Sequence, residues 1–90
     1  MTRKEKLLLR FLSRPADYTW EEMVTLMRRF GFEYISDGGG SHGAFYNEER
    51  DLYIKPAVRP HGGKSVVKDY QMKQFKEKLI AYGFIEPEED

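Results

Sequence analysis

The chain has 90 residues and a mass of 10.6 kDa, which is room for one domain and excludes a second catalytic domain. It has no cysteine, so disulfide frameworks, zinc–thiolate sites and thiol nucleophiles are excluded. Lys and Arg number 15, as do Asp and Glu. Four of the acids lie within the last five residues, so residues 1–85 carry 15 basic against 11 acidic groups, a net charge of +4 that is compatible with binding an anionic partner.

The first predicted element is a short amphipathic helix over residues 3–13, because apolar side chains recur at helical spacing from Leu8 and Pro15 follows. Basic residues ahead of this apolar run imitate the start of a signal peptide. Arg10 interrupts the run far below the length that a signal peptide or membrane span needs. We therefore predict a soluble, cytoplasmic protein in which residues 1–15 are an N-terminal helical extension.

A second helix is predicted over residues 20–30. Thr19 and Glu22 have the Thr-x-x-Glu spacing of a capping box, and Gly31 is placed to end the helix. Its apolar side chains recur at i, i+4 and i+7 and are predicted to lie in the core: Met23, Met27 and Phe30.

Three strands are predicted next, over residues 32–36, 41–47 and 51–55. A glycine-rich turn separates the first two, and a short polar turn separates the last two. Leu52 and Ile54 alternate with polar residues, which is typical of a half-buried strand. Pro56 and Pro60 are expected to end the third strand.

A last helix is predicted over residues 69–82, with Gly83 as its stop. The order helix, three strands, helix predicts an α+β fold, in which a three-stranded antiparallel sheet carries both helices on one face. The other face is left to solvent or to a partner. The chain is then a single domain over residues 1–90, with a core over about residues 20–85 and an acidic tail at residues 86–90.

The two histidines, His42 and His61, are the candidate chemical groups, and six of the eight glycines surround them. Glycine runs let backbone N–H groups approach a phosphate, but the glycine run taken alone is better explained by a loose hairpin turn. An imidazole can transfer a proton near neutral pH without a metal. Ser41 cannot form a nucleophile–base pair with His42, because successive side chains of a strand point to opposite faces. We expect no metal site, since the acids of the predicted turn have nothing nearby in sequence to complete a coordination shell.

Cations and aromatic residues suggest contacts to nucleic acid, each with a plain structural alternative. The loop from Arg59 to Lys64 places two cations and an imidazole before the last helix, where they suit phosphates or form a polar loop without a ligand. The lysines of the last helix form either a binding stripe or a solvated face. One tyrosine per strand could stack on unpaired bases or pack within the protein: Tyr34, Tyr46 and Tyr53.

Taken together, these motifs resemble the HicA toxins of bacterial toxin–antitoxin systems, which are small mRNA interferases with a double-stranded-RNA-binding-like fold. The resemblance covers about residues 20–85. Its motifs are Arg29-Phe30-Gly31-Phe32, then Gly40-Ser41-His42 with Phe45 three residues on, Leu52-Tyr53-Ile54, Pro60-His61, and Gly83-Phe84-Ile85 at the end of the closing helix. The chain departs from the family at Gly43, where many members carry a second histidine.

The resemblance implies a cytoplasmic endoribonuclease that cleaves mRNA, needs no cofactor and is controlled by a HicB-like antitoxin. It implies that His42 is the catalytic residue. Residues predicted to bind RNA beside it are Gly39, Gly40, Ser41, Arg59, His61 and Lys64. Two alternatives stay open: a non-catalytic RNA-binding or regulatory module of the same fold, and a protein-interaction domain that uses the open face of the sheet.

Overall fold

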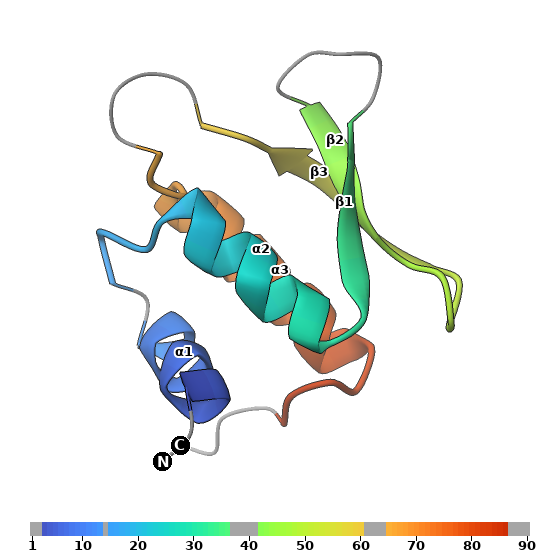
Figure 1. Ribbon diagram of the computed structural model, residues 1–90, viewed down its shortest axis with the longest axis horizontal. Coiled ribbons are helices and arrows are strands. Elements are labelled where there is room, and N and C mark those ends of the chain that lie inside the picture. Colours follow the sequence, from blue (N-terminus) through green and yellow to red (C-terminus); the bar gives the residue numbers. More distant parts are fainter. Residues whose placement is uncertain (1–2, 14, 37–41, 61–64, 87–90) are drawn as a thin grey trace.

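The structure is a computed structural model that describes residues 3–13, 15–36, 42–60 and 65–86. From α2 onward its elements follow the order α-β-β-β-α that the sequence predicts, with an additional helix before them (Figure 1). The elements are α1 (Arg3–Leu12), α2 (Trp20–Arg29), β1 (Phe32–Ser36), β2 (His42–Asn47), β3 (Leu52–Val58) and α3 (Asp69–Ala81).

The three strands form an antiparallel meander in the order β1-β2-β3. Both α2 and α3 lie on the same side of this sheet (Figure 1). The ring of Phe45, in the central strand, lies 5.5 Å from Trp20 of α2 and 5.5 Å from Phe75 of α3, measured between ring centroids. The predicted α+β architecture, with both helices on one face, is confirmed.

The ends of the helices follow local sequence signals. Thr19 Oγ1 accepts a hydrogen bond from the Glu22 N–H at 3.1 Å, and the Glu22 carboxylate accepts one from the Thr19 N–H at 3.0 Å, which completes the predicted capping box. Gly31 follows α2 with a φ of 90°, and Gly83 follows α3 with a φ of 84°. These left-handed conformations strain most other residues, so both predicted stops are confirmed.

Strand β3 continues past Pro56 to Val58, and the prediction that Pro56 ends this strand is wrong. The ladder with β2 shifts register between Gly43 and Phe45, and this bulge accommodates the extra residue of β3. Because β3 is an edge strand, proline is tolerated there, and its carbonyl still serves as an acceptor on the outer side. That carbonyl accepts a hydrogen bond from Gln71 Nε2 at 3.1 Å.

Side chains from α3 and from the residue after it close the outer edge of β3. The buried amide of Gln71 imitates a neighbouring strand, because its Oε1 also accepts from the Val58 N–H at 2.8 Å. Gln74 Nε2 donates to the Lys55 carbonyl at 3.2 Å, and the Tyr82 hydroxyl donates to the Tyr53 carbonyl at 2.7 Å. This edge of the sheet is therefore not available to another strand.

Helix α1 shares the core of the sheet and the other helices. Phe11 and Tyr18 are both fully buried, with ring centroids 5.8 Å apart. The Tyr18 hydroxyl donates to the Leu7 carbonyl at 3.1 Å, and burial raises the pKa of this phenol. The N-terminal extension expected from the sequence is thus built into the same core.

Candidate functional site

Of the residues predicted to form the site, the structure describes His42 and Arg59. The other five, Gly39, Gly40, Ser41, His61 and Lys64, lie outside the described residues. The geometry of the site is therefore built from the two described residues and their neighbours in β2, β3 and the start of α3.

His42 is exposed on the face of the sheet that the helices leave open. Along β2, burial alternates so that Gly43, Phe45 and Asn47 face the helices. His42 has the opposite parity, together with Ala44 and Tyr46, so its imidazole projects from the helix-free face. Such a group can reach a large ligand without any rearrangement of the core.

Gly43 explains why a second histidine cannot follow the first one in this chain. A Cβ atom at this position would collide with the backbone carbonyl oxygen of Ile35 and would lie 2.8 Å from the phenol end of Tyr34. The carbonyl belongs to the paired strand β1 and cannot move without disturbing the ladder. A side chain here would also point into the core, away from His42. Among the described residues, this end of β2 therefore carries one imidazole, that of His42.

A hollow of about 240 Å³ opens at the same end of the sheet as His42. It is lined in part by Arg59 and Lys68, both exposed, and by Val58, which is the cross-strand partner of His42. Lys68 is the N-cap of α3, so the partial positive charge of the first turn of that helix faces the same region. Arg59 follows Val58 in the chain, and Lys68 lines the same hollow as Arg59. The sequence does not distinguish Lys68 from the other lysines near the last helix.

The three strand tyrosines separate into two groups. Tyr34 faces the helices, and its ring meets Trp20 edge-on at a centroid distance of 5.2 Å, so it is a packing residue. Tyr46 and Tyr53 lie on the open face as a cross-strand pair with centroids 4.5 Å apart. Lys55 Nζ lies 5.3 Å from the centroid of Tyr53, a cation–π distance. The open face therefore carries an aromatic pair and a cation on the same surface as His42.

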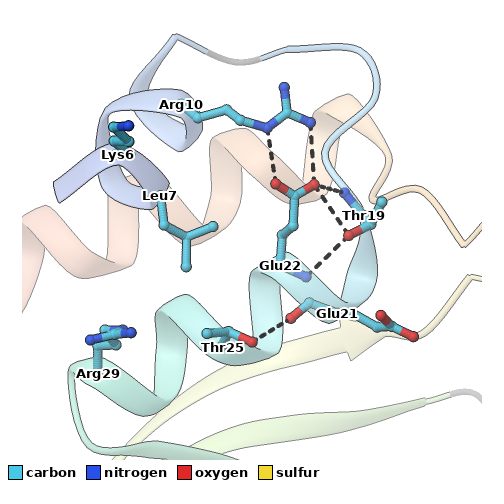
Figure 2. Close-up of a pocket in the computed structure, with 8 residues that line it drawn as sticks. All are labelled: Lys6, Leu7, Arg10, Thr19, Glu21, Glu22, Thr25 and Arg29. Atoms are coloured by element: carbon cyan, nitrogen blue, oxygen red, sulfur yellow. Dashed lines mark hydrogen bonds and ion pairs between the residues drawn. The ribbon is translucent and has the colours of Figure 1, made fainter. Parts of the chain in front are cut away.

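A separate hollow of about 480 Å³ lies between α1 and α2 (Figure 2). Its main polar feature is an ion pair in which Arg10 Nε and Nη2 donate to the Glu22 carboxylate at 2.9 and 3.2 Å. The bonded Arg10 guanidinium holds the pKa of Glu22 at about 2, although partial desolvation opposes this shift. The same carboxylate completes the capping box of α2, so this ion pair joins α1 to the start of α2. The capping spacing indicated Glu22, but nothing in the sequence indicated Arg10 as its partner.

In the part of the chain that the structure describes, no group of three or more His, Asp and Glu residues is placed to hold a metal ion. No helix among the described residues is long and apolar enough to cross a membrane. Comparisons with protein-family models, curated proteins and solved structures found no match. Function must therefore be inferred from the residues of this chain.

Proposed function

We propose that this protein is an endoribonuclease that cleaves single-stranded RNA, with mRNA as its target and His42 as its single acid–base group. The observation that carries the proposal is the position of His42, which is exposed on the helix-free face at the end of the sheet where Arg59 and Lys68 line a hollow. An imidazole beside cations is the combination that acid–base cleavage of a phosphodiester requires. The resemblance to HicA toxins rests on the same histidine.

The proposed reaction uses the substrate's own ribose. The 2′-hydroxyl loses its proton and attacks the adjacent phosphorus, so the O2′–P bond forms while the P–O5′ bond breaks. The products are a 2′,3′-cyclic phosphate and a 5′-hydroxyl that takes up one proton. His42 accepts the first proton or donates the second, a role worth about 10²–10⁴-fold in rate. Arg59 and Lys68 stabilise the negative charge on the phosphoryl oxygens.

Control of this activity would come from a second protein. In keeping with the resemblance, we propose a toxin–antitoxin role in the cytoplasm, with a HicB-like antitoxin that covers the open face around His42. Such a partner would compete with RNA for Arg59 and Lys68, and charge complementarity would speed the encounter of the two proteins. Buried apolar or aromatic anchors would supply most of its affinity.

A non-catalytic RNA-binding module is the second candidate, and the tyrosine pair favours it. Tyr46 and Tyr53 with Lys55 give the open face aromatic and cationic groups, which bind unpaired bases and phosphates without cleaving them. Both candidates predict RNA affinity that falls as salt rises. They differ in what His42 does.

The two candidates are separated by comparing the wild type with His42→Ala and with Glu77→Ala, an exposed control position on α3. Cleavage of a labelled single-stranded RNA, the affinity for that RNA, and growth arrest on expression are measured for each. We expect His42→Ala to lower the cleavage rate about 10²–10⁴-fold with little change in affinity. A His42→Ala protein that cleaves as fast as the wild type would refute the catalytic proposal. A wild type that binds RNA but never releases a cyclic phosphate would favour the binding module.

A further inference from the structure

The two edge strands of the sheet differ in whether their outward backbone groups have hydrogen-bond partners. On β3, the outward backbone groups are occupied by Gln71, Gln74 and Tyr82, as described above. Strand β1 is the other edge. Backbone hydrogen bonds outside the sheet ladders involve none of its residues among the described segments.

The direction of the β1 backbone groups follows from the ladder. The Tyr53 carbonyl points away from β2 to the Tyr82 hydroxyl, so the pair Tyr46–Tyr53 is not hydrogen-bonded between β2 and β3. Tyr46 therefore directs its backbone groups toward its other partner, Glu33 in β1. Because direction alternates along a strand, Phe32 and Ser36 present their N–H and C=O groups to the outer side of β1.

The surface beside this edge is acidic and partly apolar. A hollow of about 660 Å³ runs from the edge to the turn after β2, and Ile35, with 45% of its surface exposed, forms part of its wall. Three carboxylates and one cation also line it: Glu33, Glu48, Glu49 and Arg28. The three carboxylates lie toward the end of β2 that is opposite to His42, which begins that strand, although the hollow shares Tyr46 with the open face.

We propose that the β1 edge binds a basic, extended segment of another protein as a fourth strand. The open backbone groups at Phe32 and Ser36 would pair with the main chain of that segment, the mode known as β-augmentation. Side chains of the segment that face the open side would be Lys or Arg near Glu33 and apolar opposite Ile35. The acidic hollow beside the edge supplies the charge complementarity.

A second copy of this chain fits the edge poorly. Antiparallel self-pairing centred on residue 34 would place Glu33 of each copy at a diagonal position only about 7–8 Å from the other. The two acidic hollows would then lie along one interface, where like charges repel. Charge therefore favours a basic partner over a symmetric dimer.

The probe for this proposal is the terminally blocked peptide TKVIVKT, which alternates Lys and Ile on one face and has no like-charge conflict with β1. Its charge-reversed analogue TEVIVET and the strand-breaking analogue TKVPVKT are the peptide controls. Binding is followed by NMR titration of the full chain. We expect only TKVIVKT to shift the amide signals of Phe32 and Ser36 and to protect these amides from exchange with solvent.

Two substitutions test the edge and the charge separately. Glu33→Lys should weaken the binding of TKVIVKT about five- to tenfold, whereas Glu77→Lys on exposed α3 should leave it unchanged. Ser36→Pro removes an outward N–H without breaking a ladder bond and should abolish the protection of the edge.

Three results would overturn the proposal: equal binding of TEVIVET, equal weakening by Glu33→Lys and Glu77→Lys, or no response at Phe32 and Ser36. A concentration-dependent dimer that Ser36→Pro dissolves would also overturn it, in favour of a second copy. RNA cleavage is measured in parallel and is expected to be the same with and without peptide. Its loss in the His42→Ala protein bears only on the proposed nuclease function.

Discussion

Replacing Gln71 should lower the stability of the fold mainly through lost hydrogen bonds at the outer edge of β3. Gln71 is 1% exposed, and its amide bonds to both the Val58 N–H and the Pro56 carbonyl on the outer edge of β3. In Gln71→Met, a side chain of similar volume fills the site, so little cavity forms. The Val58 N–H and the Gln74 Oε1 lose their partner, and the Pro56 carbonyl keeps only the Gln74 Nε2 donor at 3.5 Å. Each buried polar group left unsatisfied costs about 1–3 kcal/mol. Since water can reach the half-buried Val58, we expect a total loss of about 2–4 kcal/mol.

The assay is urea denaturation followed by circular dichroism, with thermal unfolding as a second measurement. A loss of about 2–4 kcal/mol should lower Tm by roughly 10–25 °C in a domain of this size. The matched control is Lys73→Met at an exposed position on the same helix. Gln74 is unsuitable as a control, because its Oε1 accepts from Gln71 Nε2 at 2.9 Å. The control should lose less than about 1 kcal/mol. A Gln71→Met protein as stable as the control would show that the amide does not hold the strand edge.

Three further outcomes are expected. Arg10 lowers the pKa of Glu22 to about 2 from its ordinary 4.5, so the stability from this ion pair is complete above pH 4.5 and is lost as the pH falls toward 2. The variant Glu22→Gln keeps a capping side chain. In denaturant titrations it should cost about 1–2 kcal/mol at pH 7 and almost nothing at pH 2. Gly43→Ala should destabilise the protein by about 1–3 kcal/mol in the same assay, because its methyl group meets the Ile35 carbonyl; wild-type stability would refute this packing argument. Chelation with EDTA should leave RNA cleavage unchanged, since the proposed chemistry of His42 uses no metal; a loss restored by one divalent ion would contradict it.

Features governed by near neighbours in the sequence were predictable. The capping box at Thr19 and the glycine stops at Gly31 and Gly83 depend on a few adjacent residues, so the bounds of α2 and α3 were predicted to within one residue. Alternation along a strand is also local, and in the structure it leaves His42 on the face opposite to Phe45.

Features that depend on distant residues were not predictable. Pro56 breaks a strand by local rules, but here a bulge and the amide of Gln71 accommodate it. The ion pair of Arg10 with Glu22 joins residues 12 positions apart on two helices, and no periodicity marks such a pair. At the candidate site, Arg59 follows Val58, the cross-strand partner of His42. This placement depends on the register of β3 beyond Pro56, which the sequence leaves undefined.

The burial of Phe11 and Tyr18 has a consequence for how the chain comes apart. Because these rings fill the core under α2, the segment that links α1 to α2 is not a boundary between independent units. Cleavage by a protease within residues 15–17 would leave a fragment that starts near Tyr18 and lacks the ring of Phe11. Such a fragment would lose about 3–5 kcal/mol, as when a buried Phe is truncated, which is a large fraction of the stability of a small domain. A single cut there would therefore unfold the whole domain, and the rate of cleavage in this short linker would determine the lifetime of the folded protein.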